Sequence, residues 1–138
     1  MTDALVAQTA AELKIRNLIA RIALLADQGD LDEYVDQFTE DAVWAFPGGP
    51  RQGRQDIRSG AEERRAGGVT GPGSNTRHVI TTVSVQIEVE DAATADSYFL
   101  FYQHTTTAPT LFNMGHYHDT FTRHGDVWRL ARRDITLG

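Results

Sequence analysis

The chain has 138 residues, of which 41% are hydrophobic and 23% charged, as in a globular protein with one core, so we expect a single domain over residues 1–138. It contains no cysteine, which excludes disulfides, thiolate metal ligands and thiol nucleophiles. Its net charge is −6 and Lys14 is its only lysine, which argues against nucleic acid as a partner because phosphate contacts need clustered cations.

Membrane insertion and secretion are not expected either. No apolar run approaches the roughly 20 residues that span a bilayer. The first residues lack the basic start and apolar block of a signal peptide. We therefore expect a cytoplasmic protein with no membrane partner.

The first part of the chain has helical periodicity. Apolar residues recur at helical spacing between residues 3 and 26, which predicts an amphipathic helix that ends at Gly29. Asp30 is then the predicted N-cap of a second, short helix, with Glu33 in the capping-box position.

Residues 41–46 have strand character and end at the turn sequence PGGP. A polar third helix is predicted over residues 54–65, interrupted by Gly60. It ends in the pair Arg64–Arg65, which we expect on a solvated face because the surrounding sequence has mixed charge. The glycine-rich segment 67–73 is either a lid or a disordered connector.

The rest of the chain is rich in strand signals. Strands are predicted over residues 82–90, 93–107, 112–124 and 127–137. Helices followed by a meander of antiparallel strands indicate an α+β fold, with about three N-terminal helices packed on one face of a curved, mostly antiparallel sheet.

His78 lies at the mouth of the first of these strands, and its orientation depends on the strand's regularity. Strict alternation with the apolar positions from Val83 onward puts Val79 and Thr81 on the core face and turns His78 outward. A bulge of one residue near the start of the strand would turn His78 inward, and bulges are common beside active sites.

The sequence HYH in the strand 112–124 suggests a metal site, since two histidines two residues apart on a strand point the same way. The third ligand would have to be His104 or His124, and no carboxylate is placed to help. We therefore expect no metal, and assign His116 and His118 to a sheet edge or a dimer interface.

Four stretches in order resemble one known family. These are LLADQGD, FTEDAVWAF, the RH before a strand, and GHYHDTFTRHGDVWRLARR near the end. They are similar to the SnoaL-like branch of the nuclear transport factor 2 superfamily, and the resemblance covers nearly the whole chain. It implies a cone-shaped barrel in which a bent sheet wraps against helices and encloses a deep apolar pocket. Members include polyketide cyclases, scytalone dehydratase, steroid isomerase and non-catalytic binders, so the fold alone does not fix the function.

The resemblance also implies catalytic residues. Several lyases of the superfamily carry an aspartate near the end of the first helix and a histidine before the strand after the loop, which match Asp27 and His78. In that reading His78 is a general base oriented by Asp27, and the family's spacing favours the inward bulge. An arginine of the superfamily's hexachlorocyclohexane dehydrochlorinase matches Arg133. One turn before the aspartate that enzyme has a catalytic lysine and the bile-acid dehydratase a tyrosine, whereas the position here is Ile22 or the neighbouring Arg21.

The same pattern turns the Tyr117 and Asp119 face of its strand into the cone. Tyr117, where scytalone dehydratase has an asparagine, is then the expected hydrogen-bond donor to a substrate oxygen. Either alternate set of the strand 93–107 could face inward. The expected substrate-binding residues are Trp44, Phe46, Leu100, Tyr102, Phe112, Met114 and Asp119.

Together these features predict a cofactor-free lyase or isomerase that acts on a hydrophobic cyclic small molecule such as a steroid or polyketide. We expect the protein to form a homo-oligomer. Two alternatives are a non-catalytic small-molecule-binding protein of the same fold, and a structural component similar to the β subunit of aromatic-ring dioxygenases.

Overall fold

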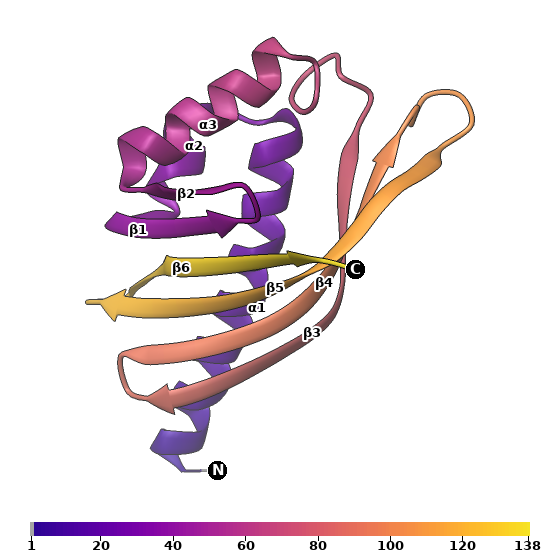
Figure 1. The fold of residues 1–138 in the computed structure, drawn as a ribbon. Coiled ribbons are helices and arrows are strands. Elements are labelled where there is room, and N and C mark those ends of the chain that lie inside the picture. Colours follow the sequence, from indigo (N-terminus) through magenta and orange to yellow (C-terminus); the bar gives the residue numbers. More distant parts are fainter. Residues whose placement is uncertain (1) are drawn as a thin grey trace.

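The computed structural model describes residues 2–138, which form three helices and six strands (Figure 1). In chain order these are α1 (Asp3–Gln28), α2 (Leu31–Asp36), β1 (Phe38–Phe46), β2 (Gly49–Gln52), α3 (Arg54–Ala66), β3 (Arg77–Val89), β4 (Ala92–Gln103), β5 (Thr110–His124) and β6 (Val127–Leu137). The predicted order of elements is confirmed, and β2 is an addition that pairs with β1 across the PGGP turn. None of the helices within residues 2–138 is both long and apolar enough to cross a bilayer.

All six strands form one sheet in the order β2-β1-β6-β5-β4-β3. Neighbouring strands are antiparallel except β1 and β6, which run parallel. The sheet bends strongly, with α1 lying across one face and α3 lying beside the β1–β2 hairpin (Figure 1). The predicted α+β class is confirmed, although β2 and β3 remain edges and the sheet does not close into a barrel.

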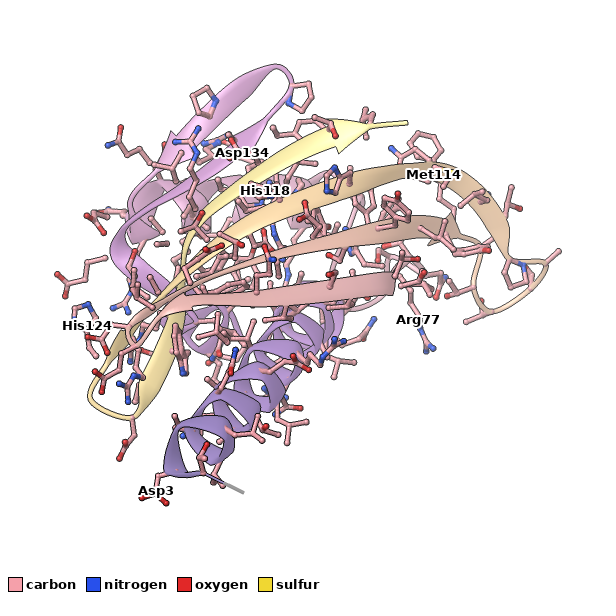
Figure 2. All side chains as sticks on the ribbon, turned by 90° about the horizontal axis from the view of Figure 1, so that it is seen from below. Asp3, Arg77, Met114, His118, His124 and Asp134 are labelled. Atoms are coloured by element: carbon pink, nitrogen blue, oxygen red, sulfur yellow. The ribbon has the colours of Figure 1, made fainter. Side chains whose placement is uncertain are left out.

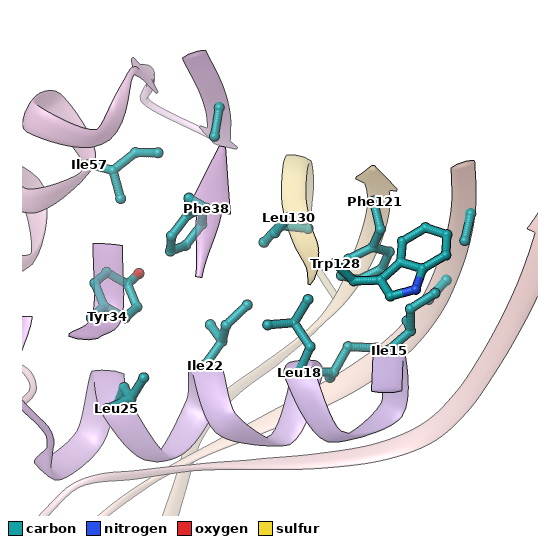
Figure 3. Packing of buried hydrophobic residues seen from close by; sticks show 14 of the residues in the cluster. Ile15, Leu18, Ile22, Leu25, Tyr34, Phe38, Ile57, Phe121, Trp128 and Leu130 are labelled. Atoms are coloured by element: carbon teal, nitrogen blue, oxygen red, sulfur yellow. The ribbon is translucent and has the colours of Figure 1, made fainter. Parts of the chain in front are cut away.

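The core lies between α1 and the sheet (Figure 3). The helix buries the predicted apolar stripe Ile15, Leu18, Ile19, Ile22 and Leu25. This stripe packs in one cluster with Phe38, Phe121 and Leu130, each fully buried. Burying a side chain of this size stabilises a fold by about 1.5–3 kcal/mol, so the stripe fixes the rotation of α1 about its axis. That rotation in turn sets the direction of Asp27 near the end of the helix.

The ends of α1 and α2 lie where the sequence predicts them, but the predicted capping contacts of α2 are absent. Gly29 ends α1 as predicted, and a Cβ on it would lie 2.5 Å from Cδ2 of Leu25. Asp30 is the N-cap of α2, but its side chain makes no capping bond. The predicted capping box is therefore wrong, because the Glu33 carboxylate binds Arg21 instead, at 2.6 Å.

A bulge interrupts β3, as predicted for an inward His78. The pairing of β3 with β4 shifts between Thr81 and Ser84, and Thr82 adopts a φ of 55° in the left-handed region. Before the bulge His78 faces inward and Val79 is exposed, whereas strict alternation required the reverse. After it, Val83 packs against the core.

Candidate functional site

Two adjoining cavities with shared wall residues lie among β1, α3 and the inner side of β4, β5 and β6. The outer one, of about 390 Å³, has a mainly aromatic wall and suits a ring-sized ligand. The inner one, of about 50 Å³, also borders Tyr34 and Arg133. Both are lined by Trp44, Arg64, Thr70, His78 and Tyr117. A ligand would thus find apolar walls at the entrance and polar groups at the inner end.

His78 and Asp27 meet at this junction. Nδ1 of His78 lies 2.7 Å from Oδ1 of Asp27, and the backbone N–H of His78 donates to Oδ2 at 3.0 Å. Because an ionised carboxylate only accepts hydrogen bonds, Nδ1 must carry the proton. Nε2 of the neutral ring is then unprotonated, which is the form that a general base needs.

Arg65 holds the end of the helix that carries Asp27. Its Nη2 donates to the carbonyl oxygens of Leu25 at 3.0 Å and Gly29 at 2.8 Å, so a cation caps the last turn of α1. A Cβ on Gly71 would lie 2.6 Å from Cγ of Arg65, so the glycine makes room for this side chain. The expectation of a solvated arginine pair is wrong, because Arg65 caps α1 and Arg64 lines the cavities.

Arg133 and Asp119 form a buried ion pair below the inner cavity. Nε and Nη2 of Arg133 lie 2.8 and 2.9 Å from the two carboxylate oxygens of Asp119, its register partner on the neighbouring strand. Burial lowers the pKa of Arg133, but the charge and hydrogen bond of Asp119 outweigh it, so the pKa of the guanidinium lies above its usual value. Asp119 is fully buried and borders neither cavity, which corrects its predicted contact with substrate.

Tyr117 lines both cavities and lies against this ion pair. Its ring stacks on Phe99 at 4.6 Å, and the guanidinium carbon of Arg133 lies 3.8 Å from the ring centre. Burial raises the pKa of Tyr117, although Arg133 acts in the opposite direction. The hydroxyl therefore stays protonated and can donate, as can that of Tyr34, whose pKa burial also raises.

The predicted aromatic wall is present in part. Trp44 and Phe46 stack at 5.6 Å and line the outer cavity, as does Phe112. Leu100, Tyr102 and Met114 do not line it. Their predicted contact with a ligand is wrong, because Phe99 and Phe101, the alternate set of β4, face inward. Leu100 pairs with Met114 and with exposed Val79, on the other side of the sheet.

The glycine-rich loop forms part of the wall. Val69 and Thr70 border the outer cavity, and Oγ1 of Thr76 donates to the carbonyl oxygen of Val69 at 3.0 Å. Ser74 likewise donates to the carbonyl of Gly71 at 2.7 Å. These bonds tie the loop to the start of β3, beside His78.

Sequence reasoning missed several residues of the site, chiefly Tyr34, Arg64 and Thr70. The one signal for Arg64 was Gly60, an unfavourable residue in a helix interior that stands one turn before it. Nothing in the local pattern distinguishes Tyr34, which lies on α2, from an ordinary core residue.

His116 and His118 lie on the opposite face of the sheet (Figure 2 labels His118). Nε2 of His116 and Nδ1 of His118 lie 2.8 and 2.9 Å from one oxygen of Asp96. The expectation that no carboxylate stands near them is therefore wrong, since Asp96 is the register partner of His118. Each histidine thus bonds Asp96, and residues 2–138 contain no group of three His, Asp or Glu side chains arranged to hold a metal.

Solved structures share this fold. A nuclear transport factor 2-like protein with a cystatin-like fold from Novosphingobium aromaticivorans is 26% identical with a TM-score of 0.85, over 97% of this chain and 86% of that one. A protein from Catenulispora acidiphila, solved in complex with S-DNPA, is 25% identical with a TM-score of 0.79, over 94% and 95% of the two chains. A putative scytalone dehydratase from N. aromaticivorans, 17% identical with a TM-score of 0.77 over 97% and 88%, shares the fold.

No curated protein matches the chain significantly. The SnoaL-like domain, in contrast, matches residues 7–134, which include most of α1, most of β6 and every element between them. That span contains the helix that carries Asp27, the bulged strand that carries His78, and the strands of Tyr117 and Arg133. The sheet, the helices on its inner face and the family match agree, and the chain belongs to the SnoaL-like family.

Proposed function

We propose that the protein catalyses cofactor-free proton transfer on a hydrophobic, oxygenated cyclic molecule such as a steroid or polyketide, as a lyase or isomerase. The observation that carries the proposal is the bond between Nδ1 of His78 and Asp27, at the junction of two cavities. Asp27 uses both oxygens on His78, one on the ring and one on the backbone, so the ring has little freedom to turn.

In the proposed reaction Nε2 of His78 removes a proton from a carbon beside a carbonyl group. The electrons of the broken C–H bond form an enolate, whose oxygen accepts a hydrogen bond from the protonated hydroxyl of Tyr117. The charge of Arg133, held in place by Asp119, lowers the energy of this anion across the Tyr117 ring. The imidazolium formed is stabilised by the carboxylate of Asp27.

The enolate can then react in two ways. In elimination the enolate electrons form a C=C bond, the β-hydroxyl leaves with the C–O electrons, and the proton on His78 converts it to water. In isomerisation His78 returns its proton to a different carbon of the conjugated system. The identity of residues near the leaving atom favours neither, and the match of Asp27 and His78 to lyases leads us to place elimination first.

The complex of the C. acidiphila protein with S-DNPA supports a ligand-binding role for this chain. The putative scytalone dehydratase supports only the fold. The cavity walls of Trp44, Phe46, Phe99 and Phe101 supply the apolar surface that a fused-ring substrate needs.

The test is turnover of hydroxysteroids, cyclic β-hydroxy ketones and their unsaturated products, with His78→Ala as the variant. We expect His78→Ala to lower kcat/KM by on the order of 10³-fold, since positioned general bases contribute about 10²–10⁴. His118→Ala, on the outer face, is the matched control and should keep wild-type activity. Equal turnover by wild type and His78→Ala contradicts the mechanism, and binding without turnover of any compound supports the non-catalytic alternative.

A further inference from the structure

Charges along the two cavities are compensated with one exception. His78 is bonded to Asp27, and Arg133 is bonded to Asp119 through two nitrogens. At the outer rim Arg51 binds both Asp56 and Glu63. Within residues 2–138, Arg64 is the one charged side chain lining these cavities that has no oppositely charged partner within 4.0 Å.

Arg64 is nevertheless held in place. Its guanidinium carbon lies 4.7 Å from the centre of the Trp44 ring, a cation–π contact that keeps the group against the cavity wall. Arg64 also contributes to the electrostatic field at Tyr34, so its charge reaches the inner cavity. A planar cation that is fixed but unpaired is suited to bind an anion supplied by a ligand.

Gly60 provides the space for this arrangement. A Cβ at Gly60 would lie 3.1 Å from Nη1 of Arg64 and 3.2 Å from Nε of Arg51. A glycine inside a helix is less stable than an alanine, and here it lets two guanidinium groups lie against the face of α3. Because Arg64 stands four residues later, it lies on the same side of the helix as Gly60 and faces the cavity.

We infer that the ligand of this cavity is a ring-bearing carboxylic acid and that Arg64 binds its carboxylate. The inference rests on the proposed function in that it takes the cavity as the substrate site. Arg133 is not available for this role, because Asp119 occupies its Nε and Nη2. The ring system then lies against Trp44 and Phe46, within the same cavity as His78. Arg64 is thus a specificity-determining residue for an acidic substrate, distinct from the proton-transfer pair.

The test compares each acid of a set of one-, two- and three-ring carboxylic acids with its own carboxamide, by isothermal titration calorimetry. The two compounds differ in charge and hardly in shape. We expect wild type to bind at least one acid about 10-fold or more tightly than its amide, as for one charge-assisted hydrogen bond of roughly 1.5–3 kcal/mol. Arg64→Gln should abolish this preference and Arg64→Lys should retain part of it.

Arg58→Gln is the matched control, since Arg58 lies on the same helix but pairs with Asp32 and Glu62 away from the cavities. Circular dichroism of each variant establishes that it is folded. If no acid binds more tightly than its amide, or if Arg64→Gln keeps the preference of wild type, the inference is overturned.

Repeating the titration with His78→Ala separates this inference from the proposed function. Retained preference for acids together with lost turnover supports both. An acid preference in a protein that turns over nothing supports the role of Arg64 and contradicts the catalytic proposal. Turnover of neutral compounds with no preference for acids supports the catalytic proposal and contradicts the role of Arg64.

Discussion

The molecule contains two clusters of aspartate and histidine on opposite faces of the same sheet. Inside, Asp27 and His78 have side chains 7% and 19% exposed, and His78 lines both cavities. Outside, Asp96 accepts from His116 and His118 while remaining 52% exposed. The hydrogen-bond distances are nearly the same, 2.7 Å inside against 2.8 and 2.9 Å outside.

Similar distances do not give similar chemistry. Water competes for every group of the outer cluster, so each hydrogen bond there contributes little and salt screens its charges. In the inner cluster the carboxylate has lost most of its water and both oxygens bind His78, so the ring is fixed in one tautomer. Burial, more than the residues themselves, separates a candidate base from a pair of surface histidines.

The largest difference between the two clusters is expected in activity when the aspartate of each is replaced by asparagine. In Asp27→Asn an amide N–H can donate to Nδ1 of His78 and so moves the ring proton to Nε2, where it blocks proton abstraction. We expect kcat/KM on a substrate found in the panel to fall by about 10²–10⁴-fold. In Asp96→Asn we expect a change within about twofold, measured in the same assay.

A result in which the two asparagine variants lose similar activity would mean that burial does not distinguish the clusters. Far-ultraviolet circular dichroism of both variants separates a loss of chemistry from a loss of fold.

The same contrast extends to two arginine–aspartate pairs whose arginines, Arg132 and Arg133, are neighbours on β6. Arg133 and Asp119 are 5% and 0% exposed, whereas Arg132 and Asp134 are 50% and 41% exposed. Removing one partner of a buried pair leaves an uncompensated charge, so Asp119→Ala should lower the free energy of unfolding by about 3–5 kcal/mol. Asp134→Ala should lower it by under about 1 kcal/mol.

Urea denaturation followed by far-ultraviolet circular dichroism measures both variants. If Asp119→Ala does not fold, Asp119→Asn, which keeps an acceptor for Arg133, should fold with an intermediate loss of stability. Equal losses for Asp119→Ala and Asp134→Ala would contradict the difference that burial predicts.

The sequence predicted the fold well because its evidence is local. The apolar stripe of α1, the glycine at its end and the strand signals of the second half depend on neighbours along the chain. The open edge of the sheet did not follow from those signals, because strand order is decided by pairing between distant segments. Glu33 shows the same limit, since its binding to Arg21 replaced a capping box that local spacing favoured.

The site was predictable where the family resemblance supplied positions and less so elsewhere. Asp27 and His78 come together as expected. The inward face of β4 could not be decided, because Phe99 and Phe101 alternate with Leu100 and Tyr102 and both sets are apolar. Asp119 fell on the predicted inner face, but only the register with β6 shows that Arg133 takes its carboxylate.

The bulge that turns His78 inward can be tested by substitution at its strained residue, Thr82. Thr82 has a φ of 55°, a conformation that costs a β-branched residue roughly 1–2 kcal/mol and glycine very little. We expect Thr82→Gly to raise the free energy of unfolding by up to about 1 kcal/mol, with the Asp27–His78 bond intact. Thr81→Gly, in extended conformation next to it, should lower stability instead, by about 0.5–1 kcal/mol in urea denaturation.

The smallest effect is expected in the outer cluster, where it appears as a shift in titration. The hydrogen bond to Asp96 raises the pKa of His118, and the charges of Asp119 and Asp134 add to it. The hydrogen bond from His118, followed by that from His116, lowers the pKa of Asp96. Proton NMR of the ring resonances measures the histidine side of this coupling, and Asp96→Asn should return the pKa of His118 toward the usual value near 6.5.

The sign of the effect on stability follows from the two shifts. Because the pKa of His118 is raised on folding, its contribution is full below the unfolded value of about 6.5 and disappears as the pH rises through the folded value. Because the pKa of Asp96 is lowered, its contribution is full above about 3.9 and disappears as the pH falls through the folded value. Asp96→Asn should therefore reduce stability most between about pH 4 and 6.5, by under about 1 kcal/mol for exposed groups. A loss that is independent of pH would show that the outer histidines do not act through their charge.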